Sequence, residues 1–332
     1  MKLMLPFQNQ PKIFAAFKSG YETVSKHLYL VLFPIFLDLF LLFGYRITIT
    51  EMIQDFIQHV MLPASATPEI IAYWETLKNQ MIEFFRYFSL TSFLRSLPAG
   101  VPSLFYVAAF ERNPLGEHHF IHLQRPGSVI LVIIGMSLIG LLFGYFLYRL
   151  LSKATSPQPA TSESFLELRS LLSWILIPII SITFMFVVII PAMLLISLIG
   201  ALLPIFTMIG YFFLTIGIVT LLTPFIFTPH LIFLEHKSIV QALLTSFRTV
   251  RLTNAKSTTF IFLGILVSYL TNMLWRIPSD DSWMLMVSIF GHGMISIIIL
   301  AASFHFVIDA RQRVRDFTEN QIPVTTLEKP LE

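Results

Sequence analysis

Residues 170–234 read SLLSWILIPIISITFMFVVIIPAMLLISLIGALLPIFTMIGYFFLTIGIVTLLTPFIFTPHLIFL and contain no Asp, Glu, Lys or Arg. As helix, these 65 residues would extend roughly 100 Å, whereas the hydrocarbon core of a bilayer is about 30 Å thick. The stretch therefore predicts two tilted membrane-spanning helices joined by a turn at Gly200–Pro204. Pro178 and Pro191 should kink the first of them, because proline removes an internal hydrogen bond.

The composition of the whole chain supports a membrane protein. Of its 332 residues, 55% are hydrophobic and only 12% are charged, whereas soluble domains have about 25% charged residues. Mean hydropathy is +0.77, so lipid must be the solvent for much of this surface. The chain has no cysteine, which excludes disulfides, thiolate metal sites and cysteine nucleophiles. Its net charge of +3 has no concentrated basic stripe, which argues against a nucleic-acid partner.

Other apolar stretches complete an all-α, polytopic integral membrane fold with about six transmembrane helices. The spans are expected at residues 28–45, 128–148, 171–199, 205–227, 258–275 and 283–308. The domain organisation that follows is an N-terminal interfacial helix, the first span, a small helical extracytoplasmic cap, a five-helix membrane bundle and a cytoplasmic tail. The expected boundaries of these parts are 1–27, 28–47, 48–127, 128–315 and 316–332.

The distribution of basic residues predicts the orientation in the membrane. With the N-terminus inside, 15 of the 22 lysine and arginine residues lie on the cytoplasmic side and 7 outside. Because cytoplasmic loops of membrane proteins are enriched in these residues, the count favours both termini on the cytoplasmic side. The expected location is the cytoplasmic membrane of a bacterium.

Two stretches outside the spans have the pattern of amphipathic helices with basic residues. In residues 12–26, Phe14, Phe17 and Tyr21 recur at helical spacing, and residues 237–252 repeat this design. We expect both helices to lie in the cytoplasmic interface of the membrane. The segments superpose at an offset of 226. This likeness marks an internal repeat of interfacial helix plus span, or reflects what any two basic amphipathic helices share.

The predicted cap begins with helical signals and ends in an irregular segment. Thr67 and Pro68 suit the N-cap and the first position of a helix. A shorter amphipathic helix is expected before it. Leu104–Phe110 is too short to cross a membrane, so it belongs to the cap or forms a re-entrant loop surrounded by protein.

One charged residue, Asp38, falls in the middle of a predicted span. A buried carboxylate there is costly unless it is protonated or paired, which makes Asp38 a candidate functional residue. Its two candidate roles are a structural tie between helices and a site in a proton or ion path. The candidate partners are Asn272, His292 and His305, or a water cavity lined by protein.

Small and basic residues provide further candidate contacts. Gly135, Gly140 and Gly144 give the second span a small-residue seam, which predicts close helix packing within the chain or self-association. Basic residues of the interfacial helices and of the C-terminal run are candidate contacts for lipid headgroups. They are Lys12, Lys18, Lys26, Arg248, Arg251, Arg311, Arg313 and Arg315.

Glu117, His118, His119 and His122 form a group of histidines in the predicted cap. His118 and His122 have a spacing that would let one helix face hold a metal, but the zinc-peptidase pattern is absent. A solvated loop is the alternative, and we predict no metal site. Because phosphate-binding, dinucleotide-binding and nucleophile motifs are also lacking, the sequence predicts no enzyme, no cofactor and no nucleotide partner.

The Ala-Leu-Leu-x-Ser-Phe pattern at Ala242–Phe247, an interfacial helix before a span and a closing basic tail carry a family resemblance. Residues 236–315, with a fainter echo at 12–45, resemble uncharacterised bacterial polytopic membrane proteins. These are similar to the membrane domain attached to some glycerophosphodiester phosphodiesterases. The acidic and histidine residues of that catalytic domain are missing from these 332 residues, so the resemblance implies no activity.

Three functions follow from these features. The first is a non-enzymatic membrane component that works by contact with lipid or with another membrane protein. The alternative is a small transporter or permease-like subunit with Asp38 as its intramembrane polar site. An interfacial hydrolase that uses the histidine group is the third.

Overall fold

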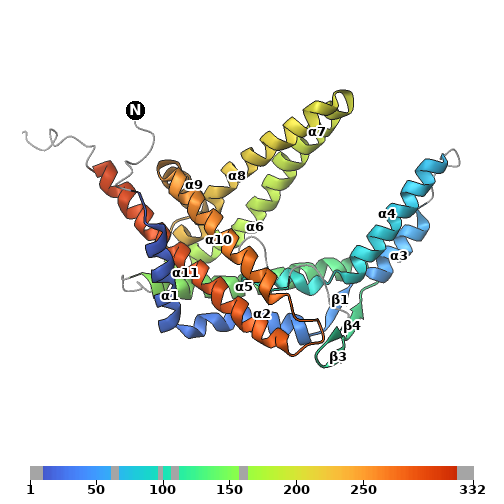
Figure 1. The fold of residues 1–332 in the computed structure, drawn as a ribbon, viewed down its shortest axis with the longest axis horizontal. Helices are drawn as coiled ribbons and strands as arrows, with labels where there is room; N and C mark the ends of the chain where they lie inside the picture. Colours follow the sequence, from blue (N-terminus) through green and yellow to red (C-terminus); the bar gives the residue numbers. More distant parts are fainter. Residues whose placement is uncertain (1–9, 61–66, 96–99, 106–111, 157–163, 320–332) are drawn as a thin grey trace, which may run out of the picture. The chain divides into compact units, whose positions relative to one another are not determined.

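The computed structural model describes residues 10–60, 67–95, 100–105, 112–156 and 164–319, and this part of the chain is mainly helical (Figure 1). Its α-helices are α1 (Ile13–Lys26), α2 (Leu32–Phe43), α3 (Thr50–His59), α4 (Pro68–Tyr87), α5 (Pro126–Thr155), α6 (Ser164–Phe184), α7 (Ile190–Leu202), α8 (Pro204–Leu234), α9 (Ile239–Leu252), α10 (Asn254–Trp275) and α11 (Met284–Glu319). The other helical turns are the 3₁₀-helices η2 (Leu28–Val31) and η3 (Leu90–Arg95) and the π-helix η4 (Met185–Ile189). Strand β1 (Arg46–Thr48) pairs in parallel with β4 (Phe120–His122), and β2 (Arg112–Asn113) pairs antiparallel with β3 (Gly116–Glu117).

The chain divides into two compact units. Unit 1 comprises Met1–Leu28, Tyr148–Ser268 and Ile297–Glu332. Unit 2 comprises Tyr29–Leu147 and Tyr269–Ser296.

Five helices in the described residues are long and apolar enough to cross a membrane. They are Pro126–Thr155, Phe165–Gly200, Ile205–Leu234, Asn254–Trp275 and Met284–Glu319. A sixth is counted only if Ile13–Lys26 and Leu28–Phe43, which are joined by a bend, form one span. By itself, Leu28–Phe43 contains 4 residues of 3₁₀-helix and 12 of α-helix. That segment would extend about 26 Å, slightly less than a hydrocarbon core of about 30 Å.

The uncharged stretch forms a hairpin in unit 1. The chain turns at Leu203, between α7 and α8 and inside the predicted range. The two arms approach closely beside this turn, because a Cβ at Gly200 would overlap the side chain of Thr207. A hydrogen bond of 2.7 Å between Ser197 Oγ and Tyr211 OH also joins the two arms. Polar residues of the hairpin thus pair with each other near its tip.

The two prolines of the first arm are accommodated differently. Pro178 lies inside α6, whereas Pro191 begins α7 directly after η4. Proline has no N–H with which to donate a hydrogen bond to the preceding turn. Just before Pro191, the helix widens into a π-helical turn with i→i+5 hydrogen bonds. The predicted interruption at Pro191 is therefore a π-helical turn.

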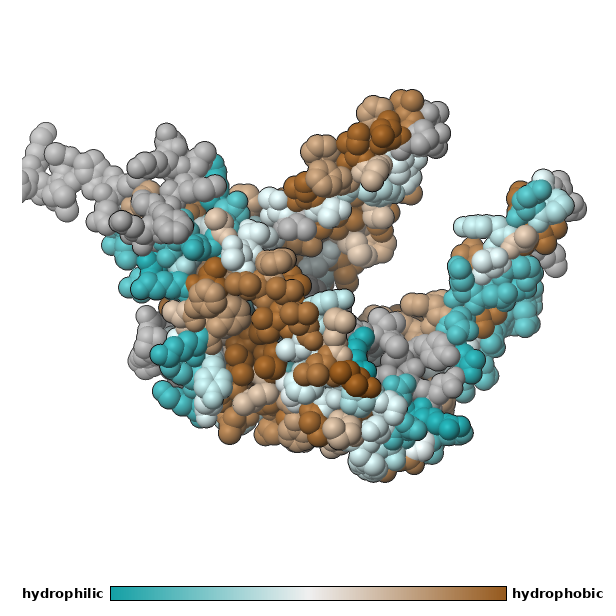
Figure 2. All heavy atoms as spheres, in the orientation of Figure 1, coloured by the Kyte–Doolittle hydropathy of each residue, from teal (hydrophilic) through white to brown (hydrophobic). Residues whose placement is uncertain are grey.

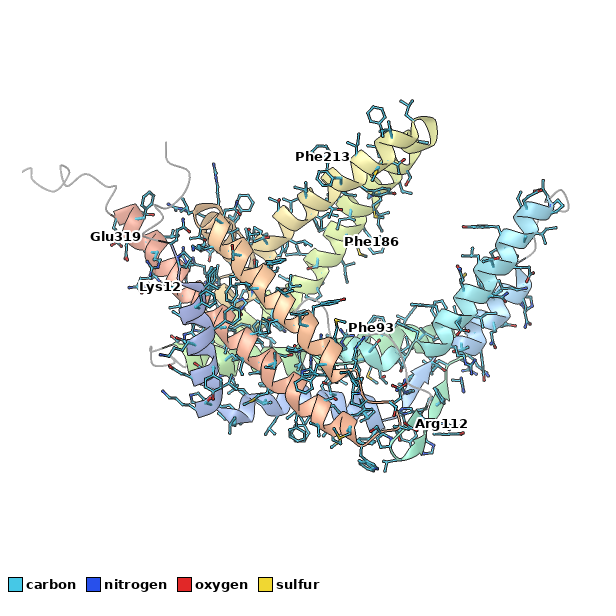
Figure 3. The ribbon with its side chains drawn as sticks, in the orientation of Figure 1. Lys12, Phe93, Arg112, Phe186, Phe213 and Glu319 are labelled. Atoms are coloured by element: carbon cyan, nitrogen blue, oxygen red, sulfur yellow. The ribbon has the colours of Figure 1, made fainter. Side chains whose placement is uncertain are left out.

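The hairpin exposes apolar side chains along most of its length. In the most apolar stretch of each arm, no described residue is buried within the chain. Figure 2 shows the brown apolar surface that these side chains form. Phe186 on η4 and Phe213 on α8 (Figure 3) are 59% and 65% exposed. Outside these stretches, the arms enter the core of unit 1 through residues such as Trp174 and Phe233, which are buried.

The core of unit 1 is aromatic. Tyr148 and Trp174 pack with ring centroids 4.7 Å apart, and Trp174 also contacts Phe233 at 5.3 Å. His230 lies 4.5 Å from Phe304 and shares a hydrogen bond of 2.6 Å with Ser303. Helices α5, α6, α8 and α11 therefore meet around one set of buried rings.

Within unit 1, helices α1 and α9 pack against their neighbours through small residues. A Cβ on Gly20 of α1 would lie 2.6 Å from the backbone N of Ala302 in α11, so the two backbones are in close contact. Ser246 of α9 is fully buried and donates a hydrogen bond of 2.6 Å to Pro224 O in α8. The larger apolar side chains that defined the amphipathic pattern, such as Phe14 and Phe247, are exposed instead.

The predicted cap falls in unit 2 and contains helices and short strands. Helix α4 starts as predicted, because the Thr67 side chain accepts the N–H of Ile70 and Pro68 follows it. Its last turn packs with α3, η3 and the start of α5 around Ile49, Leu90 and Val129. The strands are an addition to the helical cap that we expected. They are too short for the apolar–polar alternation that would reveal them in the sequence.

Candidate functional site

Asp38 on α2 is fully buried and accepts three hydrogen bonds from one loop. The Ser103 hydroxyl donates to Oδ1 at 2.5 Å, and Leu104 N–H donates to Oδ1 and Oδ2 at 3.1 and 3.0 Å. Phe105 N–H donates in turn to Ser103 Oγ at 3.2 Å. Hydrogen bonds to a carboxylate offset part of the cost of burying it. We call Asp38, Ser103 and Leu104 the Asp38 site.

The loop that meets Asp38 is irregular and buried. Val101, Ser103, Leu104 and Phe105 are each less than a tenth exposed. Irregular backbone is tolerated at membrane depth only where protein or water surrounds it, and here unit 2 does so. Residues 106–110 of the segment that we considered re-entrant lie outside the described residues.

Two arginines interact with residues of the Asp38 site. Arg276 donates a hydrogen bond of 3.2 Å to Leu104 O, so it holds the peptide whose neighbouring N–H binds Asp38. Arg95 is buried and interacts electrostatically with both Asp38 and His292. These cations bring positive charge close to the carboxylate.

A second polar group joins α10 to α11. His292 Nδ1–H donates to Asn272 Oδ1 at 2.9 Å, which leaves Nε2 to accept the Ser296 hydroxyl at 3.2 Å. His292 also interacts electrostatically with Arg276 and Arg95. All three hydrogen-bonded side chains are buried. The arrangement satisfies a neutral imidazole on both ring nitrogens.

The hydrogen-bond partners expected for Asp38 were wrong. Asn272 and His292 bind each other, whereas Asp38 accepts from Ser103 and Leu104. His305 belongs to unit 1, where its Nε2 shares a hydrogen bond of 2.8 Å with Thr23 Oγ1 of α1. The expectation considered polar residues of other spans or a water cavity, and it did not include donors from a loop.

The small-residue seam of α5 is buried in part. Gly140 and Gly144 are buried. Gly135 differs, because a Cβ there would meet no atom within 4 Å. Gly291, next to His292, lies against the ring of Trp275, with which an added Cβ would overlap. A close contact within the chain therefore explains the glycine at position 291, beside His292.

His118 is held as a neutral ring beside a buried arginine. Arg46 donates to His118 Nε2 at 3.1 Å, and Asn113 lies 3.5 Å from Nδ1. Burial, together with the positive charge of Arg46, lowers the pKa of His118 to about 4. Burial likewise lowers the pKa of Arg46 to about 10, although the charge of Asp280 opposes this shift. For Asp280, burial raises the pKa.

The histidine group does not converge on one point. His122 hydrogen-bonds Thr48 at 3.0 Å and lies 3.8 Å from a carboxylate oxygen of Glu51. His119 contacts the ring of Tyr45 instead. Among the described residues, no three His, Asp or Glu side chains are placed to hold a metal ion.

The candidate headgroup residues divide into exposed and paired ones. Arg311 binds Glu235 through two hydrogen bonds of 2.8 and 3.3 Å, and Arg313 binds Asp309 at 2.8 Å. Burial alone would raise the pKa of Glu235, but the hydrogen bonds from Arg311 and Lys237 outweigh it and lower the pKa. The remaining candidates are exposed: Lys12, Lys18, Lys26, Arg248, Arg251 and Arg315.

Several residues of these groups were not singled out in the sequence. Ser103 and Leu104 lie in an irregular loop, where no periodicity marks the atoms that face Asp38. Glu235 was not singled out, and Arg311 was expected only as a headgroup contact, although each is the first charge of its kind after an apolar span. Charges that end two spans on the same side lie at the same depth and are therefore candidate partners.

Comparison with protein families, with curated proteins and with solved structures finds no match to this chain. The class is therefore defined by the fold itself. An all-α chain with five helices that are long and apolar enough to cross a bilayer, or six with the bent pair, has the make-up of a multi-pass membrane protein.

Proposed function

We propose that this chain is a non-enzymatic membrane component that works by contact with lipid and with another membrane protein. The observation that carries the proposal is the hairpin of α6, η4, α7 and α8, which buries no residue in the most apolar stretch of either arm. These stretches therefore present a large apolar surface to their surroundings. Such a surface suits recognition by helices of a partner.

The proposal includes a placement in the membrane. The chain crosses the cytoplasmic membrane of a bacterium about six times, with both termini in the cytoplasm. The charge distribution supports this placement. Helices α1 and α9 then lie in the inner interface, with their exposed apolar side chains toward lipid. The likeness to the membrane domain of glycerophosphodiester phosphodiesterases is part of the proposal and adds no activity to it.

A photo-activated cross-linking residue in native membranes tests the proposal. At Phe186 or Phe213, which are exposed, we expect the same discrete protein adduct from both arms. At Trp174, which is fully buried, no such adduct should form. If exposed positions yield only lipid adducts, contact with a partner protein through this hairpin is rejected.

Transport is the second candidate because Asp38 carries a charge in a predicted span. The Asp38 site favours a structural role, since donors from one loop occupy both carboxylate oxygens. Replacement Asp38→Asn in proteoliposomes separates the two functions. A transporter would lose proton- or ion-coupled flux while the protein stays folded, whereas a contact protein shows no Asp38-dependent flux.

A further inference from the structure

Helices α1 and α9 are built alike in the structure, beyond their likeness in sequence. Both contain 14 residues, and their bounds, Ile13–Lys26 and Ile239–Leu252, differ by 226 at each end. Both also end alike. His27 N–H is bonded to the carbonyls three and four residues earlier, and so is Thr253 N–H, the equivalent group of α9.

The two helices also bury the same positions. Ala16, Gly20, Thr23 and Val24 of α1 are buried, and their equivalents in α9 are Ala242, Ser246, Thr249 and Val250, which are buried as well. At every position except the first and the last, the two helices agree on whether the residue is buried, half-buried or exposed. Two amphipathic helices that were alike only in composition would not need to match position by position.

The exposed faces combine large apolar side chains with cations. On α1, Phe14 and Tyr21 are 83% and 58% exposed, and on α9 the equivalent Val240 and Phe247 are 61% and 47% exposed. Figure 3 shows Lys12 at the start of α1.

The two exposed faces have the same net charge, although their charged residues do not occupy equivalent positions. With its N-cap, α1 carries Lys12, Lys18 and Lys26 against the single acid Glu22, which lies 3.9 Å from Lys18. Helix α9 carries Arg248 and Arg251 and no acid. Each face therefore has a net charge of +2.

We propose that α1 and α9 are equivalent elements of an internal repeat, and that each binds anionic phospholipid headgroups through its exposed cations. The inference rests on the membrane placement under Proposed function and names the lipid partner of these two helices. Each helix is followed directly in the chain by an apolar segment, α2 or α10, so both enter the membrane from the same side. Cations beside the bilayer then face the phosphate layer while the exposed rings enter the acyl boundary.

Lipid matches these faces better than an acidic protein surface does. An acidic protein partner would pair with the cations but leave the large apolar side chains beside them without an apolar environment. The interface of an anionic bilayer satisfies both, because charge and hydrocarbon lie within one helix diameter of each other.

The test uses the purified full-length protein in nanodiscs made of equal amounts of phosphatidylglycerol and phosphatidylcholine. Native mass spectrometry measures which of the two lipids stays bound. We expect wild type to retain phosphatidylglycerol preferentially. The α1 pair Lys18→Gln with Lys26→Gln should lower this preference, and the α9 pair Arg248→Gln with Arg251→Gln should lower it equally. Each cation removed should lower the preference for phosphatidylglycerol by at most about fivefold. The quadruple variant should show the loss of the α1 pair and the loss of the α9 pair combined.

The control is Arg112→Gln with Arg125→Gln, which removes two exposed cations from the predicted cap. An unchanged preference in the quadruple variant, or an equal loss in the control, overturns headgroup binding. A loss from one helix pair alone overturns the equivalence of the two elements. Because 0.5 M salt should also weaken the wild-type preference, the result does not depend on how any variant folds. The purified protein is tested alone, so failure of the hairpin cross-linking would leave this outcome unaffected.

Discussion

At the scale of single residues, Asp38 shows how a membrane protein handles a costly group. The chain leaves the carboxylate in place and folds a loop around it, with a hydroxyl and a backbone N–H as donors. Arg276 then fixes the same loop through the carbonyl of Leu104. The result is a tie between a predicted span and the buried loop 100–105.

Replacement Asp38→Ala should destabilise the protein by about 1 to 3 kcal/mol, because the Leu104 N–H would be buried without an acceptor and the Ser103 hydroxyl would keep only its 3.3 Å bond to Phe105 O. Thermal unfolding in detergent measures the change. Thr220→Ala is the matched control, since Thr220 is exposed and donates only within its own helix. Equal midpoints for the two variants would show that the tie contributes nothing.

The pH dependence of stability should contain a contribution from His118. Its pKa is about 4 in the folded protein and 6.5 ordinarily. Between these pH values the unfolded chain binds a proton that the folded protein excludes. The protein should therefore lose about 1 to 3 kcal/mol as the pH falls from about 6.5 to about 4.

Replacement His118→Gln should remove this part of the pH dependence, because an amide oxygen can still accept from Arg46 but does not titrate. His119→Gln is the control, since His119 is exposed. Unfolding midpoints measured from pH 7.5 to 4 decide the matter. The idea is wrong if wild type and His118→Gln keep parallel curves.

The residues of the site were predictable only in part. Asp38 stood out because a charge in an apolar run is visible in the sequence itself. Its partners did not, since Ser103 and Leu104 follow it by more than 60 residues and lie in a loop without periodicity. One of the two donors is a backbone N–H, which every residue except proline possesses. No residue type could have indicated it.

At the scale of elements, α1 docks closely through the small residues Ala16 and Gly20, whereas the large apolar residues Phe14 and Tyr21 are exposed. The sequence shows an apolar stripe on the helix, but it does not show whether this stripe faces lipid or protein. In a soluble protein that stripe would face the core. Here the close approach of Gly20 to Ala302 and Ile298 of α11 determines which side docks.

Replacement Gly20→Ala should lift α1 from α11. The new Cβ would lie 2.6 to 2.8 Å from backbone atoms of Ala302 and Ile298, and backbone cannot move aside as a flexible side chain can. We expect a loss of about 1 to 3 kcal/mol of stability. Gly135→Ala is the matched control, because its Cβ meets open space and alanine favours the helix by about 1 kcal/mol. Destabilisation by both changes alike would contradict this packing.

At the scale of the whole molecule, hydropathy predicted most of the helices. Long apolar runs and their flanking charges marked five spans, and Thr67 with Pro68 marked the start of α4. The first predicted span does not qualify by length alone, because Leu28–Phe43 counts as a span only together with α1. The division into two units was not predictable, since it depends on contacts between distant segments.

Because the chain has no cysteine, single engineered cysteines report the orientation in intact cells. With the proposed placement, an impermeant thiol reagent should label Thr76→Cys in α4 and should not reach Ser25→Cys in α1. Both positions are exposed, so neither is hidden by the fold. The replacement Thr245→Cys in α9 repeats the test. Labelling of Ser25→Cys or Thr245→Cys from outside would reverse the orientation.

The π-helical turn at Met185–Ile189 bears on how the chain tolerates changes in its length. A turn closed by i→i+5 bonds holds one residue more than an ordinary α-helical turn. Deletion of Val187 should therefore return this turn to α-helical spacing and leave the segments on both sides in register with α8, while Pro191 still donates no hydrogen bond to the preceding turn. Deletion of Ile177, which lies in regular helix and is buried, would rotate everything on one side of it. The hairpin should thus tolerate the loss of one residue in this turn and still insert into the membrane. Expression levels of the two deletion variants would test this.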